Sequence, residues 1–204
     1  MSHAFLDIAT TESVRGVQEQ MGTARAWQGL NGTPELDRFS ESEAGFIRER
    51  DSFYMSTVSE TGWPYIQHRG GPRGFLKLVD TQTLAFADYR GNRQYISTGN
   101  LVGNDRACLF LMDYARRARL KIYVHVETLA LDDDPELTRL VVDPDYRAKL
   151  ERVFKLHLHA FDWNCPQHIT PRFTKQEINA AIGPLQDRLS QLEAENRHLR
   201  EGGP

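Results

Sequence analysis

The sequence predicts a mainly β protein of the α+β class, with six antiparallel strands that can close a small barrel and helices that flank it. Three observations lead to this prediction. Short runs rich in β-branched and aromatic residues alternate with turn signals between residues 52 and 131. Helix-capping signals flank that stretch on both sides. The C-terminal residues repeat apolar positions at the spacing of a coiled-coil-like helix.

The segment before the strands combines a polar arm with a helix. Residues 1–39 are expected to form a loosely helical N-terminal arm. The folded body is expected to begin with a helix over residues 41–50, because Ser40 and Glu43 have the spacing of a capping box. Phe39 is available as the hydrophobic staple of that helix.

Six strands are expected in the central stretch, separated by glycine- and aspartate-containing turns. The longest run alternates, so that Leu120, Ile122 and Val124 face one side and Lys121 and Tyr123 face the other. That pattern is typical of a half-buried strand. The six runs are FYMSTVS, PYIQHRG, FLKLV, TLAFAD, ACLFLMD and RLKIYVHVETLAL.

Two helix starts follow the strands, each with a proline at the first helical position, Pro135 and Pro144. Both helices are expected to pack on the barrel. The second is expected to run through DPDYRAKLERVFK, with an apolar face made of Tyr146, Leu150, Val153 and Phe154.

A capping box from Thr174 to Glu177 predicts a terminal amphipathic helix and tail in residues 174–204. Its apolar residues alternate by four and three until Asn196 takes the next seam position. Such a stripe suits either a coiled coil or a helix packed on its own domain. The stripe is very narrow and its flanks are highly charged, which favours self-association. The stripe contains Ile178, Ile182, Leu185, Leu189, Leu192 and Leu199.

Length and composition favour one globular domain, residues 40–173, with an appendage at each end. A net charge of -3 gives no general attraction to nucleic acid or to an anionic membrane, so a small-molecule partner is expected. No run approaches the about 18 apolar residues of a membrane span, and no secretion-type segment is found. With only two cysteines, which should be reduced, a cytoplasmic location is expected.

Two stretches of the sequence place arginine and lysine residues next to glycines and hydroxyl-bearing residues. PYIQHRGGPRGFLKLV contains Arg69, and FADYRGNRQYISTGNL contains Arg93 followed by Ser97 and Thr98. If a helix begins near Asn92, its free N–H groups and Arg93 would form a phosphate site. An ordinary hairpin and a solvated turn with exposed cations remain the alternatives.

Four segments resemble the pyridoxamine 5'-phosphate oxidase-like FMN-binding split barrels: QHRGGPRGFLKL, LAFADYRGNRQ, NDRACLFLMDYARRARLKI and DWNCPQHITPRF. The resemblance covers about residues 53–172. It implies a split β-barrel that forms a homodimer and binds FMN between its two subunits. It also implies that Arg69 and Arg93 hold the FMN phosphate.

The resemblance assigns further residues by position. Asn92 and Gln94 stand where the family has serine and lysine. Trp163 and Arg172 match residues that the second subunit contributes. The expected cofactor-binding residues are therefore Arg69, Ala87, Asp88, Asn92, Arg93, Gln94, Ser97, Thr98, Arg119, Lys121, Trp163 and Arg172, with Ala87 and Asp88 lining the flavin and Arg119 or Lys121 near its ring.

The chain departs from the family where the vitamin substrate would bind. Ile169, and Thr170 or Pro171, replace the arginine and histidine that grip its phosphate, and VVDPDYRAKLERVF lacks the Ser-Arg-Pro substrate motif. The expected function is an FMN-dependent oxidoreductase that passes electrons between FMN and a nicotinamide cofactor or small substrate other than pyridoxamine phosphate. His168 is the substrate-side candidate. The alternative is a module that binds or senses FMN without turnover.

A metal site is the rival interpretation of HLHAFDWNCPQH. His157, His159, Cys165 and His168 could supply four zinc ligands, but their spacing is not that of a standard zinc finger or protease. On a continuing helix the first two histidines would diverge by about 200°. Packing or flavin-facing roles are therefore favoured, and no metal is expected. Cys165 is expected to be inert, because no cationic helix start is visible to lower its pKa.

Overall fold

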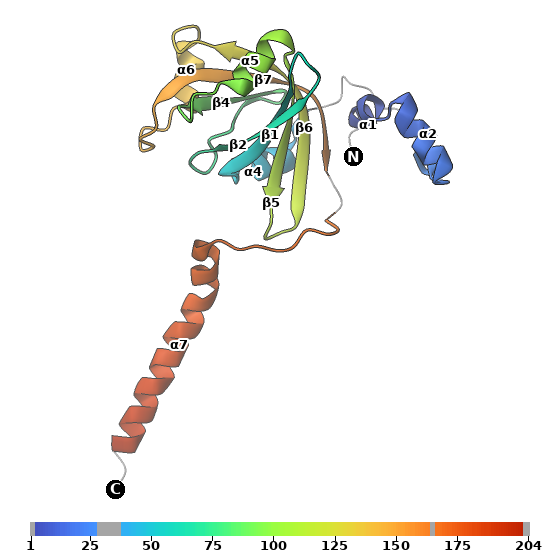
Figure 1. Cartoon of the computed structure of the whole chain (residues 1–204). Coiled ribbons are helices and arrows are strands. Elements are labelled where there is room, and N and C mark those ends of the chain that lie inside the picture. The colour runs from blue at the N-terminus through green and yellow to red at the C-terminus, as the bar shows by residue number, and fades with distance from the viewer. Residues whose placement is uncertain (1–2, 28–37, 164–165, 202–204) are drawn as a thin grey trace. The chain divides into compact units, whose positions relative to one another are not determined.

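The computed structural model describes residues 3–27, 38–163 and 166–201 (Figure 1). The chain divides into two compact units. The first contains residues 1–113 and 118–166, and the second contains residues 114–117 and 167–204.

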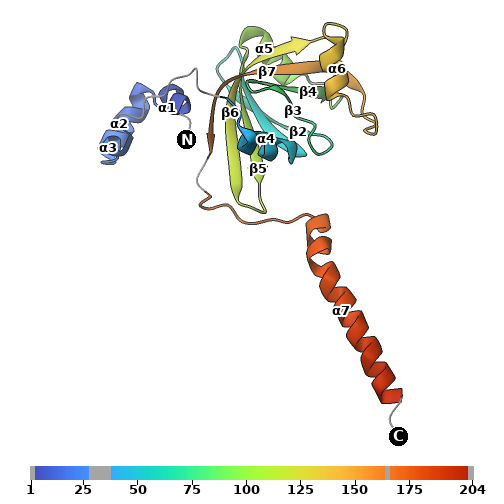
Figure 2. The same ribbon diagram turned by 180° about the vertical axis from the view of Figure 1, so that it is seen from behind.

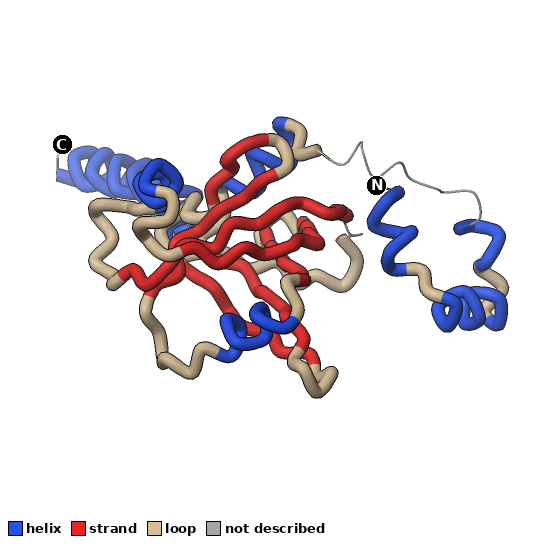
Figure 3. The backbone as a smooth tube through the Cα atoms, turned by 90° about the horizontal axis from the view of Figure 1, so that it is seen from above, coloured by secondary structure: helices blue, strands red, loops and turns tan. Residues whose placement is uncertain are grey.

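The first unit is built on one antiparallel sheet of seven strands in the order β2-β1-β5-β6-β7-β4-β3. Figure 3 shows the strands of this sheet gathered side by side. The strands are β1 (Ser52–Val58), β2 (Pro64–Gly70), β3 (Lys77–Asp80), β4 (Thr83–Tyr89), β5 (Arg106–Asp113), β6 (Ala118–Leu129) and β7 (Leu150–Trp163).

The sheet curls on itself around an aromatic core. Phe53 on β1 stacks on Phe75, with 5.5 Å between ring centroids, and meets Phe86 on β4 edge-on at 5.2 Å. Three strands separate β1 from β4 within the sheet, so these contacts require the two ends of the sheet to approach one another. The strands thus form a barrel around buried phenylalanine and leucine side chains.

All six predicted strands are confirmed, and β7 is a seventh strand where a helix was expected. The helix prediction failed because Val153 and Phe154 are both buried, on opposite faces. Val153 packs with α6 (Pro135–Val141), whereas Phe154 lies in the barrel core. A strand covered on both faces loses the alternation that distinguishes it from a helix.

The helices that flank the barrel begin at side-chain caps. In α4 (Glu41–Arg48) the Ser40–Glu43 capping box is present, and in α6 the carboxylate of Asp134 accepts a hydrogen bond from the Leu137 N–H. The indole Nε1 of Trp163 also donates to Glu43, at 2.6 Å. Figure 2 shows α4 and α6 on the outside of the strands.

The described part of the N-terminal arm is helical, as expected, in α1 (His3–Ala9), α2 (Glu12–Gln20) and α3 (Ala24–Trp27). Phe5 of α1 stacks on Tyr123 of β6, with 4.6 Å between ring centroids. The Nζ of Lys121 lies 4.5 Å from the same Phe5 ring. The first helix therefore covers the outer face of β6.

The second unit contains one long helix, α7 (Lys175–Glu201). Its predicted capping box is confirmed, since the Thr174 N–H donates to Glu177 at 2.7 Å and the Glu177 N–H donates to the Thr174 hydroxyl at 3.1 Å. Within the described ranges, no helix combines the length and apolar character needed to cross a membrane.

Candidate functional site

A small pocket of about 40 Å³ lies between β2, β4, β7 and the start of α5 (Ile96–Gly103). Arg69 and Arg93 line this one pocket, as the phosphate-site interpretation requires. The pocket is large enough for one small group rather than for a whole nucleotide. Its lining residues are Gln67, Arg69, Asp88, Tyr89, Gly91, Asn92, Arg93, Tyr95, Ser97, Thr98 and Glu151.

Arg69 is held firmly in the wall of the pocket. Its side chain is 12% exposed, and its guanidinium lies 5.8 Å from the Phe86 ring centroid and 5.4 Å from that of Phe154. The Nη1 group donates to the carboxylate of Asp88. The Nε group is buried and has no hydrogen-bond partner among the described residues. Arg69 thus keeps one buried donor that no described protein group satisfies.

Asp88 joins two arginines at the end of β4. Besides Arg69, the Nε of Arg152 on β7 lies 3.1 Å from its second oxygen. Burial raises the pKa of the Asp88 carboxyl above its ordinary value, and the charges of Arg69 and Arg152 oppose that rise. The carboxylate therefore fixes guanidinium groups from β2 and β7 beside the pocket.

Glu151 forms a second polar cluster on the same side. It accepts hydrogen bonds from Arg90 Nε at 2.7 Å, from the Tyr95 hydroxyl at 3.2 Å and from Arg152 at 3.3 Å. The hydrogen bond from Arg90 is the main cause that lowers the pKa of Glu151. These contacts anchor the loop before α5 to β7.

The loop that leads into α5 has an unusual backbone. Arg93 and Tyr95 adopt φ angles of 63° and 53°, in the left-handed region that costs a non-glycine residue about 1–3 kcal/mol. The helix was expected to begin near Asn92, but these left-handed residues delay its start to Ile96. Tyr95 caps the helix without a side-chain hydrogen bond, which leaves the first N–H groups available.

The charges around the pocket leave an excess of positive charge. Arg69 and Arg93 line it, and two more arginines bind the carboxylates of Asp88 and Glu151. Four guanidinium groups and two carboxylates give a local net charge of +2, which complements a phosphate charge of about -1.5 to -2. Together with free N–H groups at a helix start, these donors fit a phosphate ester.

Two predicted residues next to the pocket do not line it. Ala87 is 2% exposed and packs with Leu137 and Val141 of α6. Gln94 is exposed, and its side chain accepts a 3.3 Å hydrogen bond from Asn92.

Arg119 and Lys121 lie on β6, outside the lining of the pocket. The Nζ of Lys121 lies 3.7 Å from Asp162 of β7, on the face that α1 covers. The Nε of Arg119 is buried and makes no hydrogen bond within the described part of the chain.

The remaining predicted residues lie in other surroundings. Trp163 meets Phe46 edge-on, with 4.8 Å between ring centroids, in addition to its bond to Glu43. Arg172 and His168 belong to the second unit, where the Arg172 guanidinium lies 4.9 Å from the Tyr114 ring centroid. His168 is exposed and has a φ of 61°.

Two of the four candidate ligands in the rival zinc interpretation lie on a strand rather than on a continuing helix. His157 and His159 lie on the extended strand β7, so their side chains share one face. The Nε2 of His157 is 3.3 Å from Glu127, and the His159 ring is 5.2 Å from the His125 ring. His168 belongs to the second unit, and Cys165 lies outside the described residues.

A larger cavity of about 460 Å³ lies on the outer face of β5 and β6. It is lined by both apolar and polar groups, including Cys108. Burial raises the pKa of the Cys108 thiol to about 11, so that it stays protonated at neutral pH. The lining consists of Ile8, Ser56, Val58, Arg106, Ala107, Cys108, Tyr123, Val124, His125 and His159.

The structure adds pocket residues that the sequence interpretation missed. Gln67 lies two positions before Arg69 on the same strand face and accepts a 2.9 Å hydrogen bond from Ser97. The period of two along β2 was sufficient to find it. Glu151, which lines the pocket, and Arg152, which pairs with Asp88 beside it, were missed because their segment was assigned to a helix.

Comparison with protein families gives a match over most of the barrel. Residues 39–161 match the family model described as pyridoxamine 5'-phosphate oxidase. No curated protein sequence matches the chain.

Several solved structures are similar to this chain at low sequence identity. Group A Streptococcus HupZ is 14% identical, with a TM-score of 0.50 over 66% of this chain and 99% of HupZ. A protein from Clostridium acetobutylicum related to general stress protein 26 is 16% identical, with a TM-score of 0.47 over 68% and 94% of the two chains. An FMN-binding protein from Syntrophomonas wolfei is 17% identical, with a TM-score of 0.43 over 76% and 96%.

Proposed function

The chain belongs to the pyridoxamine 5'-phosphate oxidase family, and it has the split-barrel fold of that family. On this premise we propose that it is an FMN-binding flavoprotein oxidoreductase. Its proposed reaction passes electrons between FMN and a nicotinamide cofactor or a small substrate. The alternative function is the binding or sensing of FMN without turnover.

The convergence of Arg69 and Arg93 in one pocket carries this proposal. The two side chains come from segments 24 positions apart, and they meet beside the uncapped start of α5. Ser97 and Thr98 add hydroxyl donors at that helix start.

In the proposed complex, Arg69 and Arg93 bind the phosphate of FMN from two sides. Asp88 keeps the Arg69 guanidinium oriented, and Glu151 keeps the loop before α5 in place. The flavin ring supplies the electron-transfer chemistry when FMN is bound. We propose a homodimer in which Trp163 and Arg172 of the second copy complete the ring side of the site.

The substrate is proposed to be a small molecule other than pyridoxamine phosphate. Ile169 offers no charge to the phosphate of that vitamin, in contrast to the arginine of the oxidases. His168, next to it, remains the substrate-side candidate. We also propose a cytoplasmic location, in keeping with the two cysteines.

The function is tested on the purified full chain. Its absorbance spectrum is recorded, and the cofactor released on denaturation is compared with FMN, FAD and riboflavin standards. We expect FMN, and we expect NADH or NADPH to bleach the flavin absorbance before an added acceptor restores it. A flavin that neither nicotinamide bleaches would favour the binding module, and failure to bind added FMN would refute both functions.

A further inference from the structure

The long helix of the second unit presents a continuous apolar stripe. α7 buries none of its residues, and Leu185, Leu189 and Leu199 are 70%, 58% and 75% exposed. Helices in water gain most of their stability by packing an apolar face against a partner. A stripe of leucine and isoleucine along the helix therefore needs a matching surface.

We propose that α7 binds α7 of a second copy of this chain as a parallel, in-register, two-stranded coiled coil. In heptad notation, the d positions are Ile178, Leu185, Leu192 and Leu199, and the a positions are Ile182, Leu189 and Asn196. Leucine at three d positions, Ile182 at a, and a single polar a residue, Asn196, favour two strands. Gly183 and Pro184 take the outer b and c positions, so the proline side chain does not enter the seam.

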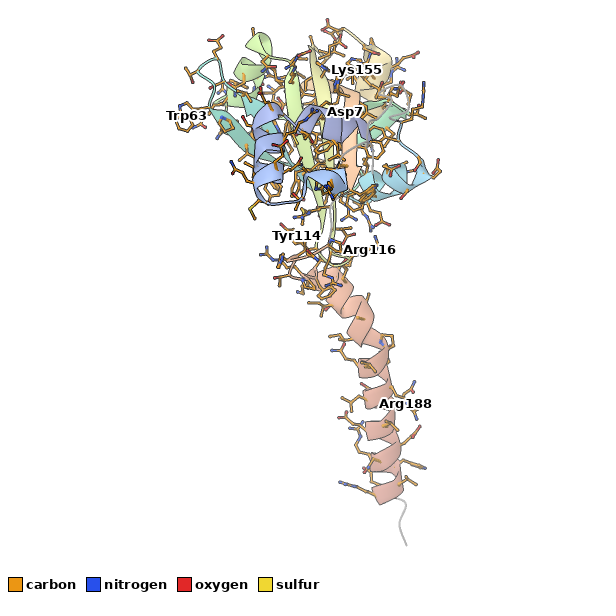
Figure 4. The ribbon with its side chains drawn as sticks, turned by 90° about the vertical axis from the view of Figure 1, so that its right-hand side faces the viewer. Asp7, Trp63, Tyr114, Arg116, Lys155 and Arg188 are labelled. Carbon is orange, nitrogen blue, oxygen red and sulfur yellow. The ribbon has the colours of Figure 1, made fainter. Side chains whose placement is uncertain are left out.

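The flanking charges match this arrangement. In a parallel pair, each g residue faces the e residue of the next heptad on the other chain. Arg188 at g then faces the partner subunit's Glu193, and Glu195 at g faces the partner subunit's Arg200. Both pairs have opposite charges, and two-fold symmetry repeats each of them. Figure 4 shows Arg188 projecting from the side of α7.

Asn196 selects the parallel orientation. In a parallel, in-register pair it meets its own copy, so the two amides can hydrogen-bond to each other. In an antiparallel pair, an a residue faces a d residue of the other chain, and every d residue here is isoleucine or leucine. That arrangement would bury the amide without a partner, which is unfavourable.

Disulfide trapping on the full chain tests the orientation. Cys108 and Cys165 are first replaced by alanine, and a single cysteine is then introduced by Leu199→Cys at the seam or by His198→Cys at the outer c position. A parallel pair brings the two seam thiols of the Leu199→Cys variant together, so mild oxidation should cross-link most of that variant and little of the His198→Cys control. Equal or absent cross-linking in the two variants would overturn the proposal.

Charge exchange gives a second test that does not depend on the seam cysteine. Arg188→Glu should weaken α7 pairing about tenfold, because two attractive pairs become repulsive, whereas Arg197→Glu at the outer b position should not. Mixing the Arg188→Glu chain with a Glu193→Arg chain should restore pairing, as measured by energy transfer between C-terminal dyes. Rescue by Glu195→Arg instead would indicate an antiparallel pair and refute the model.

The coiled coil is independent of the proposed flavin function. The charge variants of α7 should bind FMN as the parent does. Pocket variants that also carry Leu199→Cys should cross-link as fully as the Leu199→Cys chain with an intact pocket. Failure of one proposal therefore leaves the other standing.

Discussion

Replacement of Arg93 by alanine measures how much its guanidinium group contributes to the affinity for the FMN phosphate. The Arg93 side chain is exposed and forms no ion pair with any described residue, so its loss should leave the barrel intact. A charge-assisted hydrogen bond contributes about 1.5 to 3 kcal/mol. Its removal should weaken FMN binding roughly tenfold to hundredfold.

The assay compares two ligands that differ only in the phosphate. Quenching of flavin fluorescence gives the dissociation constants of FMN and riboflavin for the parent and for Arg93→Ala. The variant should lose affinity for FMN and keep its affinity for riboflavin, since riboflavin has no phosphate for Arg93 to bind. Arg73→Ala serves as control, because Arg73 is an exposed arginine outside the pocket.

Two results would refute this reasoning. An Arg93→Ala variant that binds FMN as tightly as the parent would remove Arg93 from the phosphate site. An equal loss of affinity for FMN and riboflavin would indicate that the residue shapes the ring site or the fold instead.

Three further predictions concern buried groups. Arg69→Ala should lower the free energy of unfolding by about 3 kcal/mol in urea titrations, because it leaves the buried Asp88 carboxylate with one guanidinium fewer; unchanged stability would contradict this. Glu43→Ala should cost about 2 to 3 kcal/mol, since the Ser40 cap and the Trp163 bond are both lost. Burial opposes ionisation of Glu43, but hydrogen bonds from Ser40 and Trp163 outweigh it and lower its pKa below the ordinary 4.5. The ionised form is thus favoured by folding, and the melting-temperature difference between parent and variant should be full above pH 4.5 and shrink as the pH falls through the folded pKa; a difference independent of pH would argue against this. In a variant without the other cysteine, Cys108 should react with iodoacetamide at pH 8 about a hundredfold more slowly than a free thiol, given its pKa of about 11; labelling at the rate of a free thiol would show that the thiol is not buried as described.

Local sequence signals predicted most of the fold. The six short runs became strands because each has turn residues at both ends and pairs with its neighbours. The Ser40–Glu43 and Thr174–Glu177 capping boxes fixed two helix starts, since their hydrogen bonds lie within four residues.

The errors came from segments whose conformation depends on distant contacts. The sequence of β7 resembles that of a helix because both faces of the strand are covered. α6 packs against Val153 on one face, and the barrel core surrounds Phe154 on the other. The α5 start shifted because the loop before it is tied to Glu151, a residue of that same misassigned strand. The wrong helix assignment of the β7 segment is therefore the reason why neither Glu151 nor the left-handed backbone at Tyr95 was predicted.

The ion pair between Arg69 and Asp88 joins strands from the two ends of the sheet, whereas Arg93 lies on a loop outside the core. The two arginines of the pocket thus have unequal structural roles. Substitutions in the loop that carries Arg93 can change which anions the pocket binds without disrupting the barrel. Substitution of Arg69 removes the ion pair with Asp88 that joins β2 to β4. A change of ligand specificity is therefore expected to involve the loop before it involves Arg69.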